Sequence, residues 1–221
     1  MKLLALETST RACSVALATP DGVIERHLDA GQHHTDVVIA ALEDTLATAG
    51  LTCASLDAIA FGQGPGTFSG VRTAAAIAQG LALAHDLPLV PVSSLAALAA
   101  GGARMHGATS VVAALDARRG QIYLGAYRFT ANALLATTVI TDCVSTPLEV
   151  TLAAPGDWLA VGDGWSVYAD VFAHDLAHLT RLEPRYPHAQ DLARLALQRW
   201  NAGVRVNACD ALPVYLREAL E

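Results

Sequence analysis

The chain has 221 residues, of which 53% are hydrophobic and only 5% aromatic, and its 14 basic and 21 acidic residues give a formal charge of −7. This apolar content excludes a disordered chain, and the length suffices for one large or two small globular units. A pI near 5.5 argues against independent binding to nucleic acid or to an anionic membrane, because both require clustered Lys and Arg.

The N-terminus and the cysteines indicate a cytoplasmic protein. The apolar run before Glu7 is too short for a secretory signal. No uninterrupted apolar run reaches the roughly 18 residues of a membrane span, so we expect no membrane partner. The four cysteines are widely spaced without a CxxC pair, which argues against a zinc site and disulfides; they are Cys13, Cys53, Cys143 and Cys209.

The first half of the chain reads as a hairpin followed by alternating helices and strands. Hydrophobic runs between turn residues predict strands over 2–7, 13–19, 23–28, 56–61 and 88–92. Helical periodicity predicts helices over 34–49, 71–85 and 93–100. The apolar residues of the first helix cover more than half of its circumference and leave a narrow outer edge of Asp36, Glu43 and Ala47. The second is apolar nearly all round, so it must be covered on more than one side.

The second half repeats this order after Gly101-Gly102, which we expect to break the third helix. Strands are predicted over 110–115, 121–129, 134–141 and 158–161, and helices over 147–152, 165–173 and 188–201. We predict α/β lobes of related design over 1–104 and 105–221, allowing for the last helix to pack back toward the first lobe.

A glycine-rich loop between the strand over 56–61 and the helix after it is the first candidate site. Gly64, Gly66 and Gly70 permit close backbone approach, and Thr67 and Ser69 are suitable helix caps. The loop could contact a phosphate or carboxylate at the helix N-terminus, or it could be a tight turn for close helix packing, which we favour. It is neither a Walker loop nor a Rossmann fingerprint.

Two further polar groups have a chemical and a structural interpretation. Glu7, Thr8 and Ser9 follow the first strand, where hydroxyls could meet phosphate oxygens and Glu7 could act through a metal-bound water; an ordinary Ser/Thr turn is the alternative. For Asp116 and Asp163 the alternatives are magnesium or phosphate chemistry and turn formation, which we favour.

His174 and His178 are four residues apart and would share one helix face. This spacing suits a transition metal, but no third ligand is nearby in sequence, so a solvated pair is favoured. No Gly-x-Ser-x-Gly element and no Cys–His arrangement indicates nucleophilic catalysis.

Several segments together resemble the bacterial TsaB (YeaZ) family in order and spacing. They are LALETST, SVAL, GQGPGTFSGVRTAAAIAQGLALA, PVSSLAALA, ALDARRGQIYLGAY, VGDGW and LPVYLRE. The resemblance spans essentially the whole chain and is most distinctive in GPGTFSGVR. It implies a paralogue of TsaD with the two-lobed α/β fold of actin, Hsp70 and sugar kinases (ASKHA).

The resemblance also implies a role and partners. TsaB would be a noncatalytic dimerisation subunit in threonylcarbamoyladenosine (t6A) modification of tRNA at position 37, and TsaD would carry the metal and the chemistry. TsaC would supply threonylcarbamoyl-AMP, the ATPase TsaE would share a surface, and tRNA would be met only through the complex. We expect no cofactor of its own, and a homodimer when TsaD is absent.

This sequence departs from the TsaD pattern at the metal ligands. TsaD-like chains read PVxHxxxH after the third strand, whereas Ser94 and Leu98 occupy the two histidine positions here. Because leucine cannot coordinate a metal, no TsaD-like metal site is expected. The fold superfamily seats adenosine on a turn matching Gly162 to Gly164, and we expect the Trp165 indole to fill the purine's space, with weak or absent ATP turnover.

The surplus apolar surface of the helices over 34–49 and 71–85 predicts a protein interface. Small residues such as Ala76 allow close approach of helices. We expect this surface to bind TsaD, through Ile39, Leu42, Leu46, Arg72, Ala76, Gln79 and Leu83. Two other functions stay open: an ATP-dependent small-molecule kinase using Glu7, Thr8, Asp116 and the glycine loop, and a metallopeptidase, which needs a bound metal.

Overall fold

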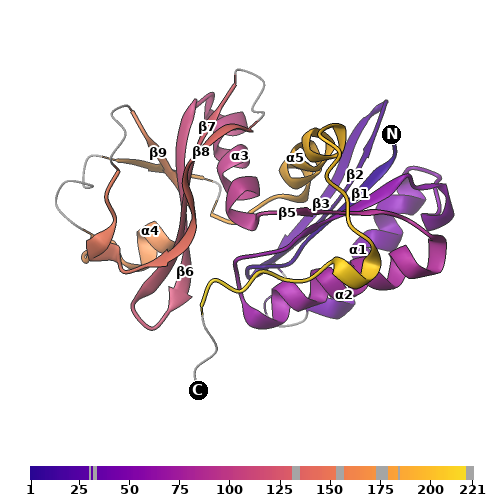
Figure 1. Ribbon diagram of the computed structural model, residues 1–221, viewed down its shortest axis with the longest axis horizontal. Coiled ribbons are helices and arrows are strands. Elements are labelled where there is room, and N and C mark those ends of the chain that lie inside the picture. Colours follow the sequence, from indigo (N-terminus) through magenta and orange to yellow (C-terminus); the bar gives the residue numbers. More distant parts are fainter. Residues whose placement is uncertain are drawn as a thin grey trace.

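The computed structural model describes residues 1–29, 31, 34–130, 135–152, 157–172, 179–183 and 185–217. Two five-stranded sheets alternate with layers of helices (Figure 1), which confirms the predicted two-lobed α/β architecture. Among the helices described, none is both long and apolar enough to cross a bilayer.

The first sheet has the strand order β3-β2-β1-β4-β5. Its first three strands form an antiparallel meander, and β4 and β5 run parallel to β1. The strands are β1 (Leu3–Glu7), β2 (Ala12–Thr19), β3 (Gly22–Asp29), β4 (Ala58–Gly62) and β5 (Leu89–Val92). The helices of this half are α1 (His34–Thr48), η1 (Cys53–Ser55), α2 (Phe68–His85) and α3 (Ser94–His106).

The second sheet repeats this topology with the order β8-β7-β6-β9-β10. Again three strands form an antiparallel meander and two run parallel to the first of them, which confirms the expected related design of the halves. The strands are β6 (Ser110–Arg118), β7 (Gln121–Phe129), β8 (Leu135–Ser145), β9 (Leu159–Val161) and β10 (Thr180–Leu182). The helices are η2 (Pro147–Glu149), α4 (Gly164–Val167), α5 (Ala189–Asn201) and η4 (Ala208–Asp210).

Helices α1 and α2 cover the outer face of the first sheet, where they share a core with Leu4, Leu6 and Phe61. The buried side of α1 is an ordinary stripe of Val38, Ala41, Leu42, Thr45 and Leu46. The outer edge of α1 is wider than predicted, because Asp44 and Thr48 are exposed as well. The apolar Ile39 and Ala40 are also exposed, so part of the apolar arc lies outside the contact with the sheet.

The chain after α5 covers a second side of α2. Ala211 is buried in the same core, and its carbonyl accepts a hydrogen bond of 3.1 Å from Gln79 Nε2. The backbone N–H of Val214 donates to the Gln63 carbonyl beside the start of α2, at 2.7 Å. This contact supplies the additional cover that the nearly all-apolar α2 required.

Helices α3 and α5 lie between the sheets (Figure 1) and belong to one continuous core with the inner faces of both. The expected break at Gly101-Gly102 was wrong, since α3 continues to His106 and ends at Gly107, which has the left-handed conformation of a C-cap. A Cβ at Gly102 would lie only 2.7 Å from Val161 Cγ1. The glycine therefore lets α3 approach the second sheet closely. The predicted lobe division at residue 104 falls within this helix.

Three elements of the second half differ from expectation. The helix predicted over 147–152 is one 3₁₀ turn, η2, and α4 is shorter than the helix predicted over 165–173, whose last residue lies outside the described residues. Strand β10 was not predicted, because three exposed residues carry no hydrophobic pattern.

An ion pair fixes α5 against α3 between the sheets. Arg104 Nε and Nη2 donate to the two carboxylate oxygens of Asp191 at 2.7 and 2.8 Å. The Asp191 side chain is only 1% exposed, and it stands in the first turn of α5, where the helix dipole favours a negative charge.

We predict that Asp191→Ala lowers the free energy of unfolding by about 3 kcal/mol, because it leaves the partly buried Arg104 guanidinium without its partner. Asp29→Ala is the control, since it removes an exposed ion pair with Arg11 and should change stability little. Urea denaturation of both variants measures the difference; equal losses would contradict the prediction.

Candidate functional site

The turn over 7–10 and the glycine loop are joined by hydrogen bonds and pack closely against each other. Thr8 Oγ1 donates to the Gly70 carbonyl at 2.7 Å, and the Thr67 N–H donates to the Ser9 carbonyl at 2.7 Å. A Cβ at Gly66 would overlap the Ser9 carbonyl, and one at Gly70 would overlap the Thr8 carbonyl. The close approach that these glycines permit is therefore an approach of two segments of the same chain.

A residue of the loop itself, Thr67, caps the start of α2. The Gly70 N–H donates to Thr67 Oγ1 at 3.2 Å, and the Val71 N–H donates to the Thr67 carbonyl. Gly64 has a positive φ of 101°, and a Cβ there would lie 3.1 Å from the Val214 carbonyl oxygen. These contacts favour the tight-turn interpretation of the loop over the anion site.

Glu7 is buried beneath this turn. Its two carboxylate oxygens accept hydrogen bonds from the Ser9 N–H at 2.6 Å and from Ser94 Oγ at 2.7 Å. Burial raises the pKa of the carboxyl, although these hydrogen bonds oppose the rise. Ser9 Oγ is buried without a hydrogen-bond partner. The arrangement ties β1 to α3 and uses both Glu7 oxygens inside the protein.

Asp116 and the loop over 162–164 come together on the second sheet. The Asp116 N–H donates to Asp163 Oδ1 at 3.1 Å, and Asp116 Oδ1 accepts from Tyr168 Oη and from the Arg118 N–H at 2.8 and 2.7 Å. Gly162 has a φ of 105°, and a Cβ there would overlap the Ala114 carbonyl; Gly164 packs against the same residue. These are turn contacts, as favoured from the sequence.

The two predicted polar groups lie on different sheets, and the C-terminal segment links them. It bonds to Gln63 through Val214, while Arg217 Nη2 donates to the Ala117 carbonyl and to Gln121 Oε1 at 2.8 and 2.7 Å. The segment therefore bridges the two halves of the chain beside both candidate loops.

The position of Trp165 contradicts the expectation that its indole fills the space of a purine and so weakens nucleotide binding. The indole is fully buried in the core on the outer face of the second sheet, with Val112 and Ala114, and it stacks on Phe172 with 4.5 Å between the centroids. The inner face of that sheet, which meets α3 and α5, belongs to a different core. Trp165 therefore does not fill the space between the lobes.

The two positions at which TsaD-like chains would carry histidines are part of the core here. Ser94 is buried and bonded to Glu7, and Leu98 is completely buried. The other histidine pair considered, His174 and His178, lies outside the described residues.

An exposed stripe runs along α2 on the side away from the sheet. It consists of Phe68, Arg72, Ala76, Gly80 and Leu83, spaced by three or four residues. Phe68 and Leu83 are 63% and 76% exposed, and Ile39 on neighbouring α1 is 44% exposed. Exposed large apolar side chains at both ends of this stripe, with small residues between them, are typical of a binding face.

The remaining predicted interface residues divide between this surface and the interior. Leu42 and Leu46 are 7% and 6% exposed and face this chain's own core, so they offer little area to a partner. Gln79 is half-buried and bonded to the C-terminal segment. Arg72 is held in place, with its guanidinium 3.6 Å above the Phe68 ring and its Nε donating to Tyr215 Oη at 2.7 Å.

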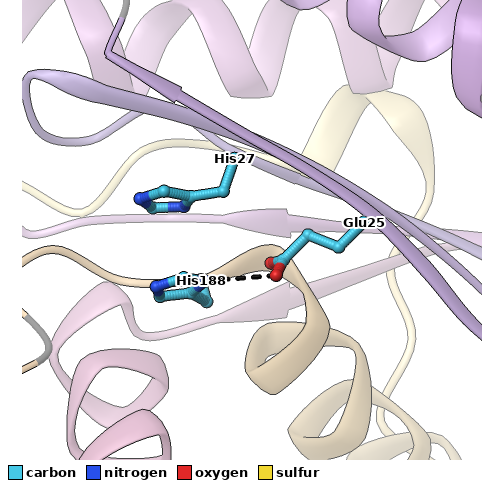
Figure 2. Close-up of side chains that lie close together, drawn as sticks. All are labelled: Glu25, His27 and His188. Atoms are coloured by element: carbon cyan, nitrogen blue, oxygen red, sulfur yellow. Dashed lines mark hydrogen bonds and ion pairs between the residues drawn. The ribbon is translucent and has the colours of Figure 1, made fainter.

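A third polar group was not predicted from the sequence. Glu25 and His27 on β3 meet His188, the residue before α5, and the two imidazole rings stack with 3.8 Å between centroids (Figure 2). Alternation along β3 places Glu25 and His27 on one face, but no local pattern could reveal that His188 joins them. Within the described part of the chain, these three residues are the group with the arrangement to hold a metal ion.

Comparison with known proteins identifies the family. The family model described as TsaD, tRNA N6-adenosine threonylcarbamoyltransferase, matches residues 17–219. The chain is 38% identical to the tRNA threonylcarbamoyladenosine biosynthesis protein TsaB of Escherichia coli, over 98% of this chain and 95% of the relative. The chain belongs to the TsaB (YeaZ) family.

Two further relatives agree with this assignment. The TsaB protein of Haemophilus influenzae is 35% identical over 98% of this chain and 94% of its own. The solved structure of YeaZ from Pseudomonas aeruginosa superimposes with a TM-score of 0.90 at 38% identity, covering 97% of this chain and 99% of that one. The resemblance seen in the sequence is confirmed, and so is the two-lobed ASKHA fold of this TsaB-family chain.

The close packing of the glycine loop can be tested by comparing an alanine substitution in the loop with one in α2. We predict that Gly66→Ala lowers the free energy of unfolding by about 3 kcal/mol, because the added methyl group meets the Ser9 backbone, which cannot rotate away. The matched change Gly80→Ala has open space around it and should raise stability by about 0.5–1 kcal/mol through helix propensity. Thermal denaturation compares the two, and a Gly66→Ala protein as stable as the wild type would contradict the prediction.

Proposed function

We propose that this chain is a noncatalytic subunit in the biosynthesis of threonylcarbamoyladenosine in tRNA, and that it supports TsaD by binding it. Membership of the TsaB family supports the pathway, since the relatives are named for it. The exposed apolar stripe of α2 supports the mode of action, because such a surface is most stable when a partner covers it.

The interior of the chain is consistent with a supporting role. The glycine loop, the turn over 7–10 and the Asp116 loop are engaged in contacts within the chain. The positions aligned with the TsaD histidines hold Ser94, which is bonded to Glu7, and the buried Leu98. We therefore assign the metal and the transfer chemistry to TsaD.

The proposed contact surface consists of Ile39 on α1 and the exposed residues of α2. Ala76 and Gly80 lie between the larger Phe68 and Leu83, so a partner helix can approach the α2 backbone closely. Arg72 is already ordered by Phe68 and Tyr215, which reduces the entropy lost on binding. In the absence of TsaD the same surface would pair with a second copy of the chain.

The remaining partners follow from the same proposal. The ATPase TsaE binds the assembled pair, and TsaC supplies threonylcarbamoyl-AMP. The complex holds the tRNA, because this chain has a formal charge of −7 and is repelled by phosphates. All of these steps take place in the cytoplasm.

Reconstitution tests the function directly. TsaD, TsaE and TsaC are incubated with tRNA and the TsaC substrates, with or without this chain, and threonylcarbamoyladenosine is measured by mass spectrometry. We expect at least about tenfold more product with the chain, corresponding to about 1.4 kcal/mol of stabilisation of the active complex. Equal yield without it would contradict the proposal. ATP turnover by the isolated chain at about 1–100 per second, as in kinases, would favour the kinase alternative.

Single substitutions test the contact surface. Ile39→Asp and Ala76→Arg each place a charge in an apolar interface, so we predict that binding to TsaD weakens about 100-fold or more while the isolated chain stays folded. Val167→Asp is the control, because Val167 is an equally exposed apolar residue on α4 in the other half. Calorimetric titration with TsaD and circular dichroism give the two readouts, and wild-type affinity of both interface variants would refute this surface.

A further inference from the structure

The cluster of Glu25, His27 and His188 has the composition and spacing of a metal site. One carboxylate oxygen and one nitrogen of each imidazole lie within 4.8 Å of one another. The rings are nearly parallel, with an interplanar angle of 10°, and one lies above the other face to face (Figure 2). His188 Nδ1 is 3.1 Å from Glu25 Oε2.

We propose that Glu25, His27 and His188 form a binding site for a divalent transition-metal ion, with Zn²⁺ as the preferred biological ion. Two imidazoles and one carboxylate are a common zinc donor set, and three protein ligands leave a coordination position open to solvent. Mg²⁺ and Ca²⁺ prefer oxygen ligands alone and do not match it. This proposal does not depend on the proposed function, because its ligands lie on β3 and at the start of α5, away from the α2 stripe.

Binding requires the two stacked imidazoles to tilt apart, because each ring nitrogen binds a metal that lies in the plane of its own ring, and two nearly parallel planes cannot both contain one ion. Donors about 2.0–2.1 Å from a tetrahedral Zn²⁺ lie about 3.4 Å from one another, so ligand atoms that are now within 4.8 Å of one another must also approach by up to about 1.4 Å. His188 exchanges its contact with Glu25 for the ion. Glu25 retains bonds from Gln190 N–H and Ser14 Oγ, both 3.0 Å, which orient its carboxylate as an outer shell does in zinc sites.

An ion at this site would connect parts of the chain that are far apart in sequence. Glu25 and His188 are separated by 163 positions, and their side chains are 14% and 18% exposed, so the ion can reach them from solvent. Because the unfolded chain does not hold the three ligands together, binding stabilises the folded state. With free Zn²⁺ at 100 times the dissociation constant, the melting temperature should rise by about 5–10 °C.

The experiment uses the full chain without an affinity tag, freed of metals with a chelator. Zn²⁺ is titrated in by calorimetry, and the melting temperature is measured with Zn²⁺ and with Mg²⁺. We expect one Zn²⁺ per chain with a micromolar or lower dissociation constant, and no shift with Mg²⁺. Affinity should fall at least about tenfold in His27→Gln, His188→Gln and Glu25→Gln.

Two controls identify the ligands. His85→Gln removes a histidine at the end of α2, away from the cluster, and should leave Zn²⁺ affinity unchanged. The double variant His174→Gln, His178→Gln removes the other candidate pair and should also retain binding. Loss of binding in that double variant, with retention in His27→Gln and His188→Gln, would overturn the proposal, as would the absence of Zn²⁺ binding to the wild type.

A measurement on the wild-type protein does not depend on whether the variants fold. Zn²⁺ should shift the imidazole NMR signals of His27 and His188 together and leave that of His85 in place. Shifts confined to other histidines would show that the cluster is only a structural contact between β3 and α5.

Discussion

The fold depends on the packing of α3 and α5 between two sheets that both present apolar inner faces. Leu3 and Ala5 from the first sheet and Val111 and Ala113 from the second belong to one continuous core with these helices. Small residues allow the helices to pack closely between the sheets, and Gly102 allows α3 to lie close to β9. Because the core is shared, the two halves are held at a defined position, and the Arg104–Asp191 pair fixes the helices relative to each other.

Close packing through small residues also explains the most distinctive segment of the sequence. In GPGTFSGVR the glycines let the loop pack closely against the Thr8–Ser9 backbone. The hydrogen bond from Ser94 to the buried Glu7 extends these contacts toward α3, so several contacts within the chain hold the region where α2 begins.

This support of α2 suits the partner-binding role that we propose for its surface. The α2 helix is held by the glycine loop at its start, by the first sheet on one side and by the C-terminal segment on another. On the remaining side of α2, Phe68 and Leu83 are exposed to solvent. A preorganised apolar face loses little entropy on association, and this connects the internal packing of the chain to its proposed supporting role.

The sequence alone determined most of the elements and their order, because helix and strand periodicities are local properties of the chain. Strands β1 to β5, helices α1, α2 and α5 and the duplicated design could be recognised in this way, and the family could be recognised from the resemblance of its sequence segments. Only the tertiary structure decided that α3 passes through Gly101-Gly102, that Leu42 and Leu46 face inward, and that Trp165 belongs to the outer core. It also brought His188 to Glu25 and His27, and laid the C-terminal segment along α2. These features arise from contacts between residues distant in sequence, whose geometry depends on how whole layers pack and therefore leaves no periodic signal in the chain.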